Sequence, residues 1–222
     1  MKLTHLTIYI FYLLIFSQAD ASDKPRNIDW NNLVPNMPEL VNPFETLSNE
    51  QILDFETLVS IREIQASKGR LDPNKAFEEG IELRYKLERQ GLNIDWLMSE
   101  YERLGREMAK RNRMTNGELD DQFVRISGYA LPLQHQVSGV KELVLVPYVG
   151  THTQVPPPPA NQTVYVRLNE THTFTDIYEP VWITGHLSAK ATRKMLSLVD
   201  GGVSLETGYT LEAGKIEPYM GY

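Results

Sequence analysis

Residues 48–113 carry apolar side chains every three to four positions, the spacing that places them on one face of an α-helix. Local signals divide this region into three helices. Ser48 with Gln51 forms a capping box at the start of the first helix. Asp72 is suited to be the N-cap of the second helix, with Pro73 at its first helical position, and Gly91 is expected to end that helix. The third segment ends in a cluster of basic side chains, which complements the dipole at a helix C-terminus. We therefore predict a helical region over residues 48–113.

From about Leu119 the apolar period changes to two, and β-branched and aromatic residues become frequent, as in strands. Gly128 and Gly185 interrupt two of the predicted strands, where a tightly curved barrel needs a kink or a bulge. This pattern favours a small OB-like β-barrel over residues 114–222, with an open sandwich as the alternative. The predicted fold class is thus α+β, with a helical segment packed on a five-stranded OB-like barrel. The predicted strands cover residues 123–130, 141–148, 162–168, 180–189 and 208–219.

The first 47 residues follow neither period. A short positive start, an apolar run and a small-residue cleavage pattern predict a signal peptide over residues 1–21 that is cleaved after Ala21. The apolar run is shorter than the roughly 20 residues that span a bilayer. The alternative is a retained membrane anchor. Residues 22–47 contain four prolines, which predict an extended lead-in. We expect three large apolar side chains to anchor this lead-in on a domain surface: Trp30, Leu33 and Phe44.

Composition narrows the classes of function. The 222 residues include 29 acidic and 22 basic side chains, a net charge of −7, and no cysteine. Thiol chemistry and cysteine-based metal sites are therefore excluded, and an acidic chain disfavours binding to nucleic acid. The sequence also lacks the nucleophile elbow, the phosphate loop, the His-Glu-x-x-His motif and the dinucleotide fingerprint. We predict that the chain is not an enzyme, and that it has no membrane span once the signal is cleaved.

The most distinctive stretch lies between the second and third predicted strands. Four consecutive prolines fix an extended polyproline II segment without backbone donors, and His152 lies in a polar turn just before them. Such a rigid segment can dock into an aromatic-lined groove of a partner, or it can pack on this protein's own tyrosines and tryptophan. The candidate binding residues are those of the turn, the prolines and the nearby aromatic side chains: Tyr148, Thr151, His152, Gln154, Pro156, Pro157, Pro158, Pro159, Asn161, Gln162 and Trp182.

Several of these stretches resemble one bacterial exported family, domain of unknown function 3299, over nearly the whole mature chain. The matching segments are Asp29-Trp30-x-x-Leu33-Val34-Pro35, Val124-Arg125-Ile126-Ser127-Gly128-Tyr129-Ala130-Leu131-Pro132-Leu133, Leu143-Val144-Leu145-Val146-Pro147-Tyr148-Val149-Gly150, Val155-Pro156-Pro157-Pro158-Pro159-x-Asn161-Gln162, Glu179-Pro180-Val181-Trp182-Ile183-Thr184-Gly185 and Glu217-Pro218-Tyr219. Members of this family are often encoded near ABC transporters of the cell envelope and near periplasmic metal-linked proteins.

The resemblance implies a periplasmic, non-catalytic binding or accessory protein with an envelope protein partner, such as a component of an ABC transport system. Family members usually carry Gly-Ala-Cys-Ile-His-Val before the prolines, and this chain has His152 at the Cys position and Gln154 at the His position. A Cys-x-His pair would suit Zn or Cu, whereas an amide is a poor ligand for either metal. We predict no cofactor, and we keep two alternatives: a metal-handling protein that binds Zn or Cu through His152, and a hydrolase that acts on polysaccharides.

Overall fold

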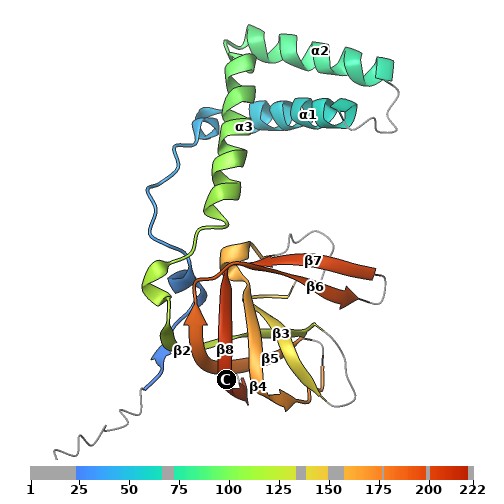
Figure 1. The fold of residues 1–222 in the computed structure, drawn as a ribbon. Coiled ribbons are helices and arrows are strands. Elements are labelled where there is room, and N and C mark those ends of the chain that lie inside the picture. Colours follow the sequence, from blue (N-terminus) through green and yellow to red (C-terminus); the bar gives the residue numbers. More distant parts are fainter. Residues whose placement is uncertain are drawn as a thin grey trace, which may run out of the picture.

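The computed structural model describes residues 24–66, 73–133, 139–149, 158–176, 178–198 and 201–219. A β-barrel carries a helical arm that stands on one end of it and projects away from it (Figure 1). The predicted signal peptide lies outside the described residues. None of the helices in the described ranges combines the length and apolar character that crossing a bilayer requires.

The arm consists of three helices, as predicted: α1 (Asn49–Ala66), α2 (Pro73–Arg89) and α3 (Ile94–Arg111). The predicted capping box is present, because the Ser48 N–H donates to Gln51 Oε1 at 2.9 Å and the Gln51 N–H donates to Ser48 Oγ at 3.2 Å. Gly91 has a φ of +87°, the left-handed conformation that favours glycine after a helix end. These local signals explain why the helix boundaries follow the sequence so closely.

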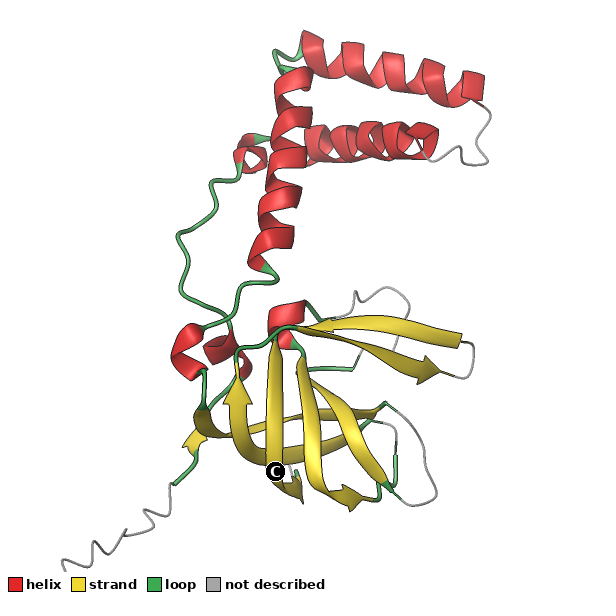
Figure 2. Cartoon of the chain, viewed as in Figure 1, coloured by secondary structure: helices red, strands yellow, loops and turns green. Residues whose placement is uncertain are grey.

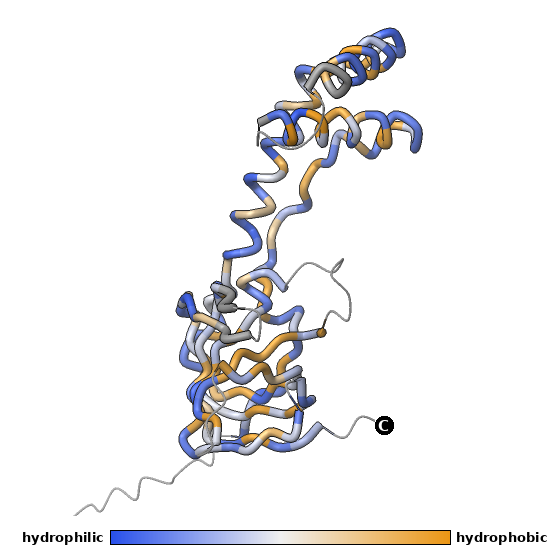
Figure 3. The backbone as a smooth tube through the Cα atoms, turned by 90° about the vertical axis from the view of Figure 1, so that its right-hand side faces the viewer, coloured by the Kyte–Doolittle hydropathy of each residue, from blue (hydrophilic) through white to orange (hydrophobic). Residues whose placement is uncertain are grey.

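The arm has its own small core, separate from that of the barrel. Phe55, Leu58 and Val59 of α1 meet Leu87 of α2, together with Ile94 and Leu97 of α3 in the same buried cluster. At Gly80 the helices α1 and α2 approach closely, since an added Cβ would lie 3.4 Å from the Ile61 side chain. In Figure 3 the apolar positions of the arm alternate with hydrophilic ones, whereas the barrel strands show longer apolar runs.

The barrel confirms the predicted OB-like architecture. Antiparallel pairing of β2 with β5 closes the sheet, β4 and β8 are parallel, and the remaining neighbours are antiparallel. The order around the barrel is β2-β3-β4-β8-β5, and β1 (Arg26–Asn27) pairs with β2 from outside. The result is a closed five-stranded mixed barrel with a sixth strand beside it. The five barrel strands are β2 (Gln122–Pro132), β3 (Val140–Val146), β4 (Val164–His172), β5 (Glu179–Ser188) and β8 (Tyr209–Pro218).

Gly128 of β2 and Gly185 of β5 lie where the backbone of a neighbouring strand approaches closely. The register of β5 against β8 shifts between Thr184 and Gly185, and a Cβ at Gly185 would overlap the backbone of Glu212. A Cβ at Gly128 would lie 2.7 Å from the carbonyl oxygen of Val146. Only glycine fits these positions, because real Cβ atoms do not approach backbone so closely.

A hairpin that the sequence analysis did not predict connects β5 to β8. Its strands are β6 (Thr192–Leu198) and β7 (Gly201–Thr207), visible beside the barrel in Figure 2. Leu205 packs against an apolar cluster outside β3 and β4, and the Lys194 ammonium lies 4.0 Å from the centre of the Tyr165 ring. The hairpin therefore covers part of the outer face of β3 and β4.

The lead-in connects the barrel to the arm, and its predicted anchors are confirmed. In η1 (Trp30–Leu33) the Trp30 indole N–H donates to the Ser127 carbonyl at 2.9 Å, and Leu33 is buried in the barrel core. In η2 (Pro43–Thr46) the Phe44 ring packs on the arm core, 5.3 Å from the Phe55 ring. Aromatic side chains thus fix this proline-rich segment at both of its ends.

Candidate functional site

The turn before the prolines and the first two of the four prolines lie outside the described residues. Thr151, His152, Gln154, Pro156 and Pro157 all fall within residues 150–157. Their predicted roles in binding, including metal binding by His152, stay predictions. Tyr148 follows β3 and is exposed.

The end of the proline segment belongs to the joint between arm and barrel. Pro159 precedes η4 (Ala160–Gln162), and its carbonyl accepts a hydrogen bond from the Thr163 hydroxyl at 3.0 Å. Both Pro158 and Pro159 are half-buried, as is Gln162. Pro158 and Pro159 therefore lie at the start of a hydrogen-bonded turn, and the two roles considered for the proline segment, docking to a partner or packing on this protein's own rings, stay predictions.

Asn161 is the central residue of this joint. Its side chain is 3% exposed, and its amide donates to the carbonyls of Arg111 at 2.9 Å and Met114 at 3.1 Å. Its backbone N–H donates to the Asn112 carbonyl at 2.9 Å. Asn161 thereby satisfies carbonyl groups at the end of α3, which have no partner within the helix. Direct contact between Asn161 and a ligand would require this joint to open.

Tyr209 forms the second half of the joint. Its buried hydroxyl donates to the Leu33 carbonyl and accepts from the Asn116 N–H, both at 2.5 Å. Burial raises the pKa of Tyr209, and the hydrogen bond from Asn116 opposes this change. The hydroxyl therefore links η1, the segment after α3 and the first residue of β8.

Trp182 lies apart from this joint, on the outer face of β5. Its ring lies 4.3 Å below the Arg125 guanidinium and 5.5 Å from the Tyr219 ring. The described members of the predicted binding set thus lie apart from one another: Pro158, Pro159, Asn161 and Gln162 at the joint, Trp182 on the outer barrel face and Tyr148 in the exposed segment after β3.

A groove that the sequence analysis did not predict lies in the arm, between η2, α1 and α3. It has a volume of about 500 Å³, which is in the range of ligand sites. Three rings form a continuous aromatic wall: Phe44 lies 5.3 Å from Phe55, and Phe55 lies 6.4 Å from Tyr101 in an edge-to-face arrangement. The Phe44 position is set by Asn42, whose side chain accepts the Phe44 N–H at 3.1 Å. The wall is therefore built from three separate elements, η2, α1 and α3.

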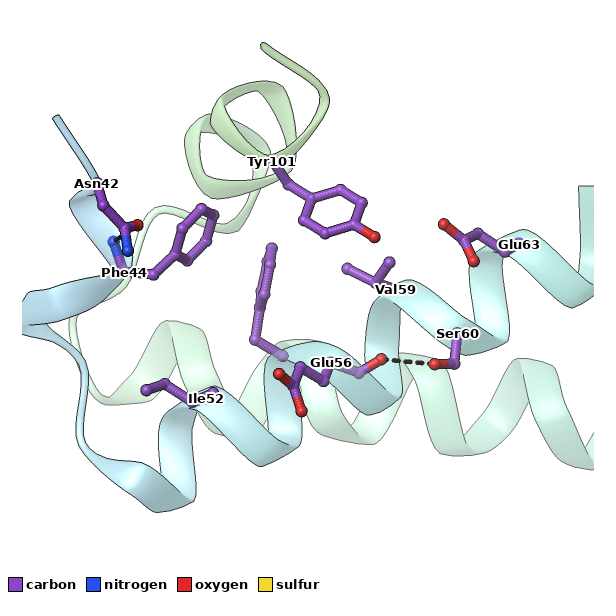
Figure 4. A pocket seen from close by; sticks show the side chains of 9 residues that line it. Asn42, Phe44, Ile52, Glu56, Val59, Ser60, Glu63 and Tyr101 are labelled. Carbon is purple, nitrogen blue, oxygen red and sulfur yellow. Dashed lines mark hydrogen bonds between the residues drawn. The ribbon is translucent and has the colours of Figure 1, made fainter. Parts of the chain in front are cut away.

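The rim of the groove is acidic. Glu56 and Glu63 lie along α1 at the groove, and the Glu63 carboxylate points toward the Tyr101 hydroxyl (Figure 4). Between them, the Ser60 hydroxyl donates to the Glu56 carbonyl at 2.9 Å. Among the described residues no basic side chain forms an ion pair with Glu56 or Glu63, whereas the nearby Arg62 is paired with Glu102 at 3.0 Å. The groove can therefore accept an apolar group that carries a positive charge.

The arm helices carry further apolar side chains that no part of the described chain covers fully. Phe77, Ile81 and Tyr85 follow one another at intervals of four residues on α2 and are exposed. Four-residue spacing places them in one row along the helix. Sequence periodicity identified the helical faces, but it could not distinguish a covered face from an open one.

The described histidines contact aromatic rings. His172 lies 4.6 Å from Phe174 and His186 lies 5.1 Å from Phe123, measured between ring centres. Within the described ranges, no three His, Asp or Glu side chains converge in a way that could hold a metal ion. His135 and His152 lie outside those ranges, so the metal hypothesis stays a prediction.

Comparisons with known proteins place the chain in a family. Among the curated proteins, none matches it. The chain is similar to a solved structure of a DUF3299 family protein from Pseudomonas aeruginosa PAO1, at 21% identity and a TM-score of 0.47, over 90% of this chain and 99% of that one. The family model described as "Protein of unknown function (DUF3299)" matches residues 30–218. This match covers the lead-in, the arm and the barrel together, and the chain therefore belongs to the DUF3299 family.

Proposed function

We propose that this chain is an exported, non-catalytic accessory protein of the cell envelope that binds a protein partner through the groove of its helical arm. The aromatic groove with its acidic rim is the observation that carries this proposal. Apolar clefts with a few polar groups at the edge are the usual form of binding sites.

The distribution of exposed apolar side chains supports the arm as the contact region. Within the part of the chain that the structure describes, fourteen large apolar residues are exposed, and nine of them lie between residues 41 and 114. Four of the remaining five are tyrosines, whose polar hydroxyl group can be hydrated when the ring is exposed. Apolar side chains gathered on one part of a surface mark sites of interaction. The nine residues are Val41, Leu53, Phe77, Ile81, Tyr85, Trp96, Tyr101, Met108 and Met114.

The charge at the groove defines the chemistry of the partner. Glu56 and Glu63 would attract Lys or Arg, while the aromatic wall would hold an apolar side chain beside it. A cation can also lie over the Tyr101 ring. We infer that the partner offers a segment in which a large apolar residue is next to Lys or Arg.

The barrel offers less open surface than the arm for binding a protein partner. OB barrels often bind ligands on the face of their second and third strands, which correspond to β3 and β4 here. In this chain Leu205 and Lys194 of the hairpin cover part of that face. This covering supports a partner site on the arm.

The location and the kind of partner rest on the sequence. The predicted signal over residues 1–21 supports export, and the family resemblance supports a partner among envelope proteins such as an ABC transport component. The arm of an exported protein would reach such a partner without a membrane span of its own.

The geometry of the groove favours binding over hydrolysis. Seven residues of helix separate Glu56 from Glu63, which places their Cα atoms about 10 Å apart along the axis. Paired carboxylates that cleave glycosidic bonds flank the scissile bond. The two groove carboxylates form a row along the rim instead.

Reversal of the rim charge tests the proposal. Glu56→Lys with Glu63→Lys should abolish cross-linked co-purification of the envelope partner and leave the thermal unfolding temperature nearly unchanged. The matched control is Glu118→Lys with Glu170→Lys, two exposed carboxylates on the barrel side of the molecule. The control changes net charge equally and should retain the partner. Equal recovery from both double variants would refute the groove as the contact site.

A further inference from the structure

The outer face of β2, β5 and β8 carries aromatic side chains in a regular arrangement. Residues directly opposite one another across paired strands project to the same face. Ile126 and Ile183 project inward, since each is almost fully buried. The neighbours of Ile126 and Ile183 along each strand therefore project outward. The strand register arranges these outward residues in three rows across β2, β5 and β8: Arg125, Thr184 and Lys215; Ser127, Trp182 and Glu217; Tyr129, Pro180 and Tyr219. We call these nine residues the outer platform.

Rings occupy the middle and one end of the outer platform. Trp182 is central, and its ring lies 5.5 Å from the Tyr219 ring at an angle of 48°. The Tyr219 N–H donates to the Pro180 carbonyl at 3.0 Å, which extends the β5–β8 pairing and fixes the position of Tyr219. Tyr129 is directly opposite Pro180 on the other side, and both tyrosines are exposed. The rings are thus held in place by the sheet.

Three charged side chains of the outer platform form one cluster of two cations and one anion. Glu217 lies 2.9 Å from the Lys215 ammonium and 3.6 Å from the Arg125 guanidinium, which itself lies over Trp182. The hydrogen bond from Lys215, followed by the nearby charge of Arg125, lowers the pKa of Glu217. The outer platform therefore offers both hydrogen-bond donors and acceptors, and its charged cluster has two cations for one anion.

These features exclude two common modes of peptide binding. Addition of a peptide strand requires a free sheet edge, but β5 is paired on both sides, with β2 and with β8. Docking of a helix requires an apolar groove, whereas the outer platform lies on the outward side of a closed barrel. A ligand that stacks on the exposed Tyr129 and Tyr219 rings and hydrogen-bonds to the charged cluster between them matches better.

We propose that the outer platform binds a β-1,4-linked glycan chain. Pyranose rings with equatorial hydroxyl groups expose C–H bonds on their flat faces, which match the negative faces of aromatic rings. Their hydroxyl groups can accept hydrogen bonds from Arg125 and Lys215 and donate one to Glu217. This site lies on a different part of the molecule from the arm groove and would hold the protein on an envelope polysaccharide while the arm binds a protein.

Calorimetric titration of the mature chain with chitohexaose and with cellohexaose tests this site. At least one of these β-1,4-linked hexasaccharides should bind. Tyr219→Ala and Tyr129→Ala should each weaken binding about tenfold, the order of magnitude for the loss of one stacking ring. Tyr219→Phe should bind nearly as tightly as the wild type, because it keeps the ring.

A variant in the arm separates this site from the proposed partner site. Tyr101→Ala should bind the hexasaccharide normally and lose the protein partner, while Tyr219→Ala should do the reverse. Absence of binding by the wild type to both hexasaccharides would overturn the proposal. Equal binding of α-linked maltohexaose, or binding of a polyproline peptide in place of the glycans, would also contradict it.

Discussion

Tyr209 shows how one hydroxyl can connect three segments of this chain. It donates to Leu33 and accepts from Asn116, so Tyr209→Phe would leave a buried carbonyl and a buried N–H without partners. We expect this substitution to lower the free energy of unfolding by about 1–3 kcal/mol in urea denaturation. An unchanged midpoint of urea denaturation would show that water replaces the hydroxyl without a loss of stability.

The same residue predicts a dependence on alkaline pH. The folded state raises the pKa of Tyr209, so its contribution to stability is fully present below the ordinary tyrosine pKa of about 10 and is lost as the pH rises through the folded value. The wild type should therefore lose stability more steeply than Tyr209→Phe above that pH. An equal loss of stability with pH in the wild type and Tyr209→Phe would contradict this role of the Tyr209 hydroxyl.

Asn161 provides a second test at the residue scale. Asn161→Ala removes the donors to Arg111 and Met114 at the end of α3, and it should lower the free energy of unfolding by about 1–3 kcal/mol. It should also speed proteolysis within residues 112–116, where the arm joins the barrel. The control is Gln162→Ala, the adjacent half-buried residue, which should leave both measurements nearly unchanged.

At the scale of elements, the close approach of β5 to β8 depends on the absence of a side chain at Gly185. Gly185→Ala forces a methyl group against the Glu212 backbone, which should cost about 1–3 kcal/mol of stability or prevent folding. Gly214→Ala is the matched control on β8, because an added methyl there meets nothing within 4 Å. The control should unfold within about 0.5 kcal/mol of the wild type. Thermal unfolding of both variants measures the difference.

The elements differ in how far their sequence predicts them. The three helices follow from periodicity and local caps, and the five barrel strands follow from alternation with glycine at the kinks. The hairpin was missed although Asp200-Gly201, between two alternating runs, is a recognised turn signal. The strand β1 could not be predicted, because two residues carry no period and pair only through contact with β2.

The residues of the candidate sites also differ in how far the sequence predicts them. Trp182 was identified as a candidate from its sequence context, and it lies at the centre of the outer platform. The role of Asn161 was beyond sequence analysis, because its partner carbonyls are 47 and 50 residues away. The arm groove joins side chains from residues 42 to 101, and only the folded arrangement shows that a face remains open there.

At the scale of the whole molecule, the two cores are separate and one joint connects them. The lead-in bridges the same gap, with Leu33 in the barrel core and Phe44 on the arm core. This construction lets the arm project while the barrel stays closed, as Figure 1 shows. A projecting arm with a groove suits a protein that binds its partner at a distance from the β-barrel.

Site-specific photo-cross-linking in the native cell envelope tests the central claim most directly. A benzophenone amino acid at Tyr101 should give one discrete adduct, and the same label at the exposed Met195 of the hairpin should not. The adduct should disappear when Glu56→Lys and Glu63→Lys are added. An adduct that forms equally from both labelled positions, or that survives the charge reversal, would contradict a partner site in the arm groove.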